Sequence, residues 1–370
     1  MLEVVDQGDL DRLLTLMAQW EGSDLHIKAG ASPRMRIDGE LRTLTDEDRF
    51  TPEETAALVD AIMPPQVAET FEKHHEADFA YSVAGVGRFR CNAFYQRSSA
   101  AIVLRRVRPN PGSAEELGLP PVVYELANEQ RGLVLVTGPT GSGKTTTLAT
   151  MIDHINRTRP CHIVTIEDPI EYLHRDQPAA VDQREVGFDT DSFSTAMRVV
   201  LRQDPDVILV GEMRDPETAY AALSAAETGH LVFTTLHTIN VTETISRVVD
   251  FFPPYQQTQI RVALAGSIRG TVAQRLVRRA DGTGRVPALE VMVANGRIRQ
   301  CIVDPEITSD IEQIVADGEY YGMQTFDQSL AQLLQEGTIT LQEALLVASN
   351  PHDLRVMLES RGLVATGNRW

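Results

Sequence analysis

The feature that most constrains this chain is a glycine-rich octapeptide lying between an apolar run and a helix-compatible stretch. Residues 133–136 read Leu-Val-Leu-Val, residues 146–152 suit a helix, and between them lies Gly138-Pro139-Thr140-Gly141-Ser142-Gly143-Lys144-Thr145. Glycines allow successive backbone N–H groups to turn around phosphate oxygens, and a helix N-terminus adds partial positive charge. The sequence therefore predicts a strand–loop–helix unit that binds a nucleotide.

The residue types in this loop predict individual roles. Lys144 is expected to reach the β- and γ-phosphates of a nucleotide, and Thr145 is expected to hold Mg²⁺. The backbone from Gly138 to Thr146, where the helix would begin, is expected to supply the remaining phosphate contacts. At this point ATP or GTP, together with Mg²⁺, is the predicted ligand.

Length and composition set the class of protein. A chain of 370 residues is expected to form two or three domains, each with its own core. No apolar run approaches the roughly 18 to 20 residues that span a bilayer. The acidic, polar start at residues 1–6 is also unlike a signal peptide, so we expect a cytoplasmic protein without direct membrane insertion. Cys91, Cys161 and Cys301 lie far apart without a CxxC pair, which indicates buried apolar side chains rather than disulfides or a zinc site.

The charge of the chain is negative overall and unevenly distributed. A formal net charge of −18 argues against non-specific nucleic-acid binding, which depends on basic groups that displace counterions. Residues 261–300 nevertheless carry eight arginines against two acids, whereas residues 303–360 carry eleven acids against one arginine. Two solvent-exposed faces of opposite charge would explain this pattern. So would two complementary charged surfaces that meet between the subunits of a ring.

The clearest break in the chain is the proline- and glycine-containing stretch at residues 108–113, which suits neither helix nor strand. Upstream of it, Asp38-Gly39 predicts a two-residue hairpin turn of type I′. Three further strands are expected at residues 79–83, 88–96 and 100–107. Residues 1–108 are therefore expected to form a small α+β domain, followed by a linker at residues 109–113.

Downstream, apolar strands alternate with helical stretches, which is typical of a mostly parallel sheet with helices on both faces. These strands are expected at residues 133–137, 162–166, 207–210 and 231–235. From about residue 258 the chain reads as helical to its end. We place the α/β core at residues 114–290 and a helical C-terminal region at residues 291–370.

Two of the expected strands end in acidic residues. Glu212 follows the strand at 207–210, and Glu167 follows the strand at 162–166. In nucleotide hydrolases, acids at the C-terminal ends of parallel strands hold Mg²⁺ and orient the attacking water. Either acidic cluster alone could be a helix cap, but their combination with the glycine-rich loop favours catalysis. Glu212, in the position of a Walker B acid, is also the candidate Mg²⁺ ligand.

Two histidines flank the fourth of these strands. A lone histidine is more often a hydrogen-bonded structural residue than a catalyst. His230 comes before the strand, whereas His237 follows it, at the edge where a γ-phosphate is expected. His237 is therefore the candidate phosphate sensor.

Further motifs follow one another along nearly the whole chain. They are Ser23-Asp24-Leu25-His26, Ile166-Glu167-Asp168-Pro169, Arg184-Glu185-Val186-Gly187, Gly211-Glu212-Met213-Arg214-Asp215, the stretch from Gly229-His230 to His237-Thr238, and Gly322-Met323-Gln324-Thr325-Phe326-Asp327. Together with the glycine-rich loop, and in this order, they resemble the hexameric ATPases of type II secretion and type IV pili. Within that family the chain is most similar to the PilT-like retraction ATPases of twitching motility.

This resemblance implies an N-terminal PAS-like α+β domain and a RecA-like P-loop domain with a helical C-terminal region. It also implies ATP hydrolysis in a homo-hexamer, with Glu167 and Glu212 as the water-activating and metal-associated acids in an order left open. Family members bring arginines from the N-terminal domain to the nucleotide. The matching positions are Arg90 and Arg105, with Arg97 a weaker match; an exposed strand face is the alternative explanation.

The resemblance favours retraction over assembly because a four-cysteine zinc insert, usual in assembly and secretion members, has no counterpart between residues 274 and 288. It implies a motor, peripheral at the inner face of the cytoplasmic membrane, that disassembles pilin through an inner-membrane platform protein. A typical retraction motif is altered at residues 297–304, where its second arginine is missing. An accessory role beside a second retraction ATPase therefore stays open, as does an assembly or type II secretion ATPase.

Two functions of other classes also remain. A nucleotide-gated regulatory or scaffold protein would bind ATP with little turnover, but the presence of both acidic strand ends disfavours it. A nucleic-acid translocase has only the arginine-rich segment at residues 261–300 in its favour.

Overall fold

The computed structural model describes residues 7–364. Contacts divide the chain into two compact units. The N-terminal unit runs to Pro109 and includes Glu171–Leu173, and the C-terminal unit contains Asn110–Ile170 and the chain from His174 onward. The segment Glu171–Leu173 groups with the first unit because the N–H of Arg108 donates to the carbonyl of Glu171 (3.3 Å) and the N–H of Leu173 to that of Arg108 (3.1 Å). Residues 1–6, on which the prediction about a signal peptide rests, lie outside the described residues.

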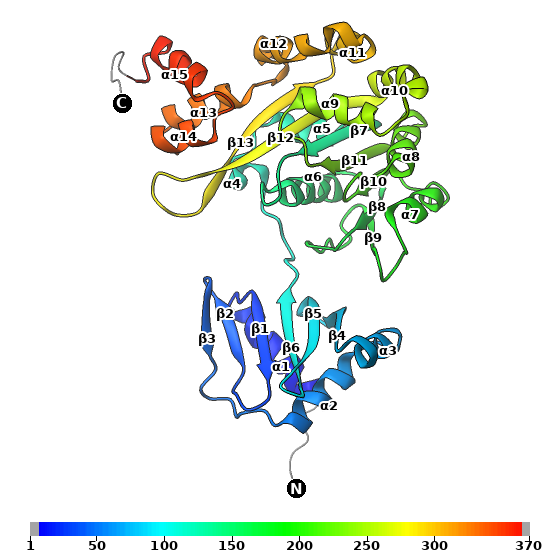
Figure 1. Ribbon diagram of the computed structural model, residues 1–370, viewed down its shortest axis with the longest axis vertical. Helices are drawn as coiled ribbons and strands as arrows, with labels where there is room; N and C mark the ends of the chain where they lie inside the picture. Colours follow the sequence, from blue (N-terminus) through cyan, green and yellow to red (C-terminus); the bar gives the residue numbers. More distant parts are fainter. Residues whose placement is uncertain (1–6, 365–370) are drawn as a thin grey trace. The chain divides into compact units, whose positions relative to one another are not determined.

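The N-terminal unit is built on an antiparallel sheet with the strand order β3-β2-β1-β6-β5-β4 (Figure 1). Its strands are β1 (Asp24–Lys28), β2 (Arg34–Ile37), β3 (Glu40–Thr43), β4 (Glu76–Val83), β5 (Gly87–Gln96) and β6 (Ser99–Arg106). Its helices are α1 (Gln7–Gln19), α2 (Pro52–Ile62) and α3 (Pro65–His74). In α1, Leu10, Leu14 and Met17 recur at helical spacing and are buried in this unit's core.

The predicted hairpin is confirmed. Ile37 pairs with Glu40 across a two-residue turn, and Asp38 and Gly39 both have positive φ, as a type I′ turn requires. The strands expected between residues 79 and 107 are confirmed as β4, β5 and β6.

The C-terminal unit contains a seven-stranded sheet with the order β13-β12-β7-β11-β10-β8-β9. Its strands are β7 (Gly132–Thr137), β8 (His162–Glu167), β9 (Ala180–Glu185), β10 (Val207–Val210), β11 (Leu231–Leu236), β12 (Ile268–Arg278) and β13 (Arg285–Val293). Every neighbouring pair from β12 to β9 is parallel, and only β13 runs antiparallel to its neighbour. The prediction of a mostly parallel sheet is therefore confirmed.

Helices cover both faces of this sheet (Figure 1). One face packs against α7 (Phe193–Val200), α8 (Pro216–Glu227), α9 (Val241–Asp250) and α10 (Pro254–Ser267), and the other against α5 (Val122–Ala127) and α6 (Lys144–Thr158). Leu133 and Leu135 of β7 belong to the first core and Val134 and Val136 to the second. Because both faces are covered, the strand is apolar at every position rather than at alternate ones.

The remaining helices are α4 (Ala114–Leu117), α11 (Gly296–Val303), α12 (Ile311–Ala316), α13 (Phe326–Gln335), α14 (Leu341–Val347) and α15 (Pro351–Ser360), with short 3₁₀ helices at Pro305–Asp310 and Glu319–Tyr321. Helices α13, α14 and α15 form a further core with β12 and β13. No helix among residues 7–364 is long and apolar enough to cross a bilayer.

The prediction of continuous helix from about residue 258 is wrong. The chain is helical only to Ser267 and then forms β12 and β13, which extend the sheet beyond β7. The segment contains Ala, Gln, Arg and Leu, which are good helix formers, but pairing with β7 and β13 decides its conformation. The short strand β9 was likewise not predicted. Cys91 and Cys301 are buried as expected, whereas Cys161 is partly exposed.

Candidate nucleotide-hydrolysis site

The glycine-rich loop joins β7 to α6 in the C-terminal unit. Helix α6 begins at Lys144, with Gly143 as its N-cap residue at a φ of 91°. Gly138 has a φ of 141°, and a Cβ atom there would lie 2.3 Å from the backbone oxygen of Gln274. A Cβ atom on Gly143 would lie 2.6 Å from Nε2 of Gln274. Both positions therefore require glycine, and the loop has the narrow backbone that phosphate binding needs.

The polar groups of this loop suit an anionic ligand. Ser142 Oγ is buried and has no hydrogen-bond partner among the residues that the structure describes. The ammonium of Lys144 donates to the carbonyl oxygens of Gly138 (2.8 Å) and Pro139 (3.1 Å). Burial lowers the pKa of Lys144, and the charge of Glu212 opposes this shift. Phosphate oxygens would fit against these groups and against the N-terminus of the 15-residue helix α6. Thr145 and Thr146 lie in the first turn of α6.

Glu212 follows β10 and lies within a cluster of charged side chains. Its carboxylate accepts from Arg214 Nη2 at 2.7 Å and lies 3.1 Å from His237 Nε2. Arg214 also approaches Asp168, with Nη1 at 3.9 Å from Oδ2. Burial disfavours the charged form of Glu212, but Arg214 and His237 outweigh it and hold the pKa of Glu212 below its usual value. The side chain is therefore a carboxylate at neutral pH, the form that a divalent cation binds.

Glu167 is the last residue of β8 and is largely buried. Its Oε1 accepts from Thr165 Oγ1 at 2.7 Å and from Gln183 Nε2 at 3.0 Å. Gln183 in turn accepts, through its own Oε1, from the backbone N–H of His174 at 2.8 Å. These bonds fix the orientation of the Glu167 carboxylate at the strand end.

The strand order brings these groups to one edge of the sheet. The parallel strands β7, β11, β10 and β8 are neighbours in that order, so the glycine-rich loop, His237, Glu212 and Glu167 follow one another at their C-terminal ends. His230 precedes β11 at the opposite edge, where its Nδ1 lies 3.0 Å from the carbonyl oxygen of Ala225. Of the two histidines, only His237 lies with the acids.

The predicted arginines belong to the N-terminal unit. Arg90 of β5 and Arg105 of β6 lie directly opposite each other in the sheet, and both are exposed. Arg105 Nε donates to Oδ1 of the buried Asp24 at 2.7 Å. Arg97 lies in the turn between the same two strands, with a φ of 50°. Arg90 and Arg105 therefore lie side by side, whereas Arg97 lies in the turn at the far end of the same pair of strands.

A family model for type II/IV secretion system proteins matches residues 7–346. This chain belongs to the type II/IV secretion system protein family. It is 44% identical to the retraction ATPase PilT of Pseudomonas aeruginosa over 345 residues. This aligned region covers 93% of this chain and 99% of that protein. It is 42% identical over 351 residues to the type IV pilus ATPase PilU of the same organism, covering 95% and 91%.

A crystal structure of the pilus retraction motor PilT with bound ADP superimposes with a TM-score of 0.85, at 45% identity, covering 94% of this chain and 99% of that one. The predicted similarity to PilT-like ATPases is confirmed, and the chain is a P-loop ATPase of the secretion family.

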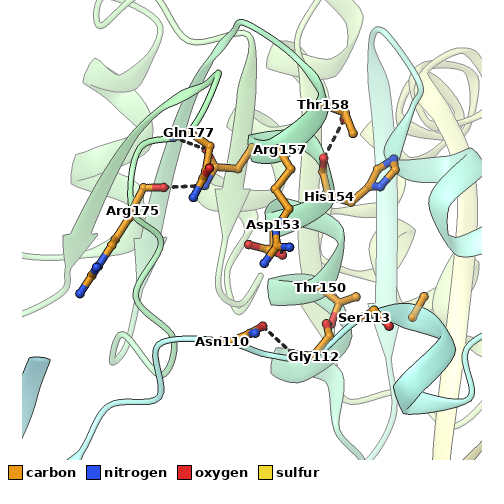
Figure 2. A network of polar contacts seen from close by, with 12 residues as sticks. Asn110, Gly112, Ser113, Thr150, Asp153, His154, Arg157, Thr158, Arg175 and Gln177 are labelled. Carbon is orange, nitrogen blue, oxygen red and sulfur yellow. Dashed lines mark hydrogen bonds and ion pairs between the residues drawn. The ribbon is translucent and has the colours of Figure 1, made fainter.

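The P-loop helix of this secretion ATPase is held by polar contacts on two sides (Figure 2). Thr150 Oγ1 donates to the carbonyl oxygen of Gly112 at 3.2 Å, in the stretch that leads to α4. Nearer the other end of α6, Asn156 Nδ2 donates to the carbonyl oxygen of Arg175 at 2.8 Å, and its Oδ1 accepts from the N–H of Gln177 at 3.2 Å. Helix α6 is therefore hydrogen-bonded to the two segments at which the chain enters the C-terminal unit, one at Gly112 and one at residues 175–177.

Sequence reasoning missed three polar residues at this site. Arg214 belongs to the motif at residues 211–215 but has no predicted role of its own, and the motifs assign none to Gln183 or Gln274. Gln183 contacts Glu167 from β9, and Gln274 contacts the P-loop from β12, so neither could be placed without those strands. The sequence offers one signal for the two glutamines: each lies in a strand-like segment and is followed by an arginine.

Proposed function

We propose that this chain is an ATP-hydrolysing motor that powers retraction of a type IV pilus and hence twitching motility. The observation that carries the proposal is the row formed by the P-loop, His237, Glu212 and Glu167 along one sheet edge. Hydrolysis requires a phosphate cradle, a metal-associated acid and an acid that orients water. The choice of pilus retraction rests on the similarity to PilT and PilU over 93% and 95% of this chain.

Each side chain in the row has a proposed role. Lys144 and the loop N–H groups bind the phosphates, and His237 senses the γ-phosphate beside Glu212. Mg²⁺ carried by ATP would be held by Thr145 and Glu212 and would neutralise charge on the phosphates. Glu167, held by two hydrogen bonds, is suited to accept a proton from the attacking water.

We propose that the site is completed in a homo-hexamer. Residues 1–108 would be a PAS-like domain and residues 109–113 a linker, with a RecA-like core at 114–290 and a helical region at 291–370. Arg90 and Arg105 of one copy would then stabilise charge on the phosphoryl group bound by a neighbour. Such arginines raise turnover by roughly 10³-fold or more in other nucleotide hydrolases.

The proposed partner is an inner-membrane platform protein of the pilus. The motor would be cytoplasmic and peripheral at the inner face of the membrane. We also propose a second retraction ATPase as a partner, since this chain is nearly as similar to PilU as to PilT.

The test is ATP turnover by the purified protein beside Lys144→Ala and Glu212→Ala. We expect Lys144→Ala to lose nucleotide binding and turnover, because it removes the charge that meets the phosphates. Glu212→Ala should bind nucleotide and not hydrolyse it. Lys73→Ala, which changes a lysine on α3 of the other unit, is the matched control and should behave as wild type.

Twitching motility of strains carrying the same changes tests the biological assignment. Intact motility with Glu212→Ala would refute the motor proposal. A wild type that binds ATP without hydrolysing it would instead indicate the nucleotide-gated scaffold. If this chain is an accessory ATPase, the purified protein should hydrolyse ATP. A strain that lacks its gene should still retract its pili, driven by the second retraction ATPase.

A further inference from the structure

Gln274 of β12 lies directly against the P-loop. Its Nε2 donates to the carbonyl oxygen of Ser142 at 2.7 Å, and its Oε1 accepts from Thr147 Oγ1 at 2.8 Å. The residue is only 3% exposed. The amide therefore bridges the last part of the loop and the first part of α6, which begins at Lys144.

The two hydrogen bonds specify an amide at this position. A donor is needed toward the Ser142 carbonyl and an acceptor toward the Thr147 hydroxyl, and glutamine presents one of each at the end of one side chain. A carboxylate would place a second acceptor against the carbonyl oxygen, and an apolar side chain would leave that buried oxygen unpaired. The absence of Cβ atoms at Gly138 and Gly143 leaves room for Gln274 to approach.

The contact with Ser142 also determines where a neighbouring donor points. In a trans peptide unit the C=O and the following N–H point in opposite directions. When the Ser142 carbonyl is held toward Gln274, the N–H of Gly143 is directed away from β12. We propose that Gln274 is a positioning residue, which holds the Gly143 N–H toward the phosphates and fixes the loop against α6.

This inference rests on the proposed function. Gln274 would act on the nucleotide only through the P-loop, which it contacts. Gln274 contacts the Ser142 carbonyl oxygen, whereas the proposed phosphate contacts are made by N–H groups of the loop. Its effect should therefore appear in the affinity for phosphates rather than in a proton-transfer step.

The experiment measures ADP affinity by titration calorimetry for wild type, Gln274→Met and Gln274→Glu. Inorganic pyrophosphate, which probes the phosphate contacts alone, is then used to compete with ADP. Methionine keeps the length of the side chain and loses both hydrogen bonds. We expect both variants to bind ADP and pyrophosphate roughly tenfold or more weakly, because a loosely held N–H no longer meets the charged oxygens.

Gln324→Met is the matched control. Gln324 Nε2 donates to the carbonyl oxygen of Leu289 at 3.0 Å, so the same substitution removes a comparable hydrogen bond from the same unit. We expect its melting temperature to fall while its ADP affinity stays at the wild-type value. An equal loss of ADP affinity in Gln274→Met and Gln324→Met would show a general structural effect and would overturn the proposal.

A folded Gln274→Met with wild-type affinity for ADP and pyrophosphate would also overturn it. If Gln274→Met does not fold, the same comparison is made with Gln274→Glu, which keeps the acceptor for Thr147. The binding measurement does not depend on turnover. A wild type that binds ADP but does not hydrolyse ATP would therefore refute the proposed function, while the titrations still decide the role of Gln274.

Discussion

At the scale of single residues, two glutamates of the C-terminal unit show how surroundings set the charge of one side-chain type. Glu212 is held below its usual pKa, with Arg214 and His237 outweighing burial. Glu290 of β13 is more deeply buried, and its pKa is raised to about 7. The N–H of Val241, 2.8 Å from Glu290 Oε2, and the charge of Arg275 favour the carboxylate, but burial outweighs them. Of these two glutamates, Glu212 is the one whose pKa favours the carboxylate that a cation binds.

The raised pKa of Glu290 predicts a stability that falls with rising pH. The folded state binds the proton more tightly than the unfolded state, so this contribution is complete below about pH 4.5 and is lost as pH rises to about 7. The loss is on the order of 3 kcal/mol. We expect Glu290→Gln, which keeps an acceptor for Val241, to remove this fall in urea-unfolding free energies measured between about pH 5 and about pH 8.

Glu217→Gln, at an exposed carboxylate of α8, serves as the control and should leave the pH dependence of the wild type unchanged. A Glu290→Gln variant with the wild-type slope would show that Glu290 does not titrate in this range.

At the scale of elements, the acidic residues after β10 divide between two tasks. Glu212 faces Arg214 and His237, whereas Asp215 is the N-cap of α8. Asp215 Oδ1 accepts from the N–H of Thr218 at 2.8 Å, and Oδ2 from its hydroxyl at 2.9 Å. The helix-cap explanation therefore holds for Asp215, three residues after the candidate metal ligand.

This division predicts a separable effect. Asp215→Ala should lower the free energy of unfolding by about 1 kcal/mol, because it removes the acceptor for the first turn of α8. Asp215→Asn keeps a cap and should restore most of that loss. Chemical denaturation of wild type, Asp215→Ala and Asp215→Asn measures the loss and its recovery. Equal stability of Asp215→Ala and wild type would contradict the assignment of Asp215 as the N-cap of α8.

At the scale of the whole molecule, the two units have separate hydrophobic cores. The nucleotide loop and both acids lie in one unit, and the candidate arginine fingers lie in the other. Arg105 is bound to the buried Asp24 at 2.7 Å, which fixes its guanidinium at the exposed surface of the N-terminal sheet. Under the proposed function, a second copy supplies the arginine that completes the site.

We expect Arg105→Ala to bind ATP normally and to turn it over roughly 10³-fold more slowly. Light scattering at the same protein concentration should show the assembled ring for wild type and variant alike. Arg42→Ala, which changes an exposed arginine of β3, is the control and should keep wild-type turnover. A monomeric wild type with full activity at every concentration would rule out a site shared between copies.

The sequence by itself determined the P-loop, the two acidic strand ends, the separation of His237 from His230, and the type I′ hairpin. These features depend on residues close together in the chain, or on the rule that parallel strands end at one edge. The tertiary structure alone decided that residues 268–278 and 285–293 form strands and that Gln274 and Gln183 reach the site. Those contacts join residues 132 and 16 positions apart, so no local pattern could specify them.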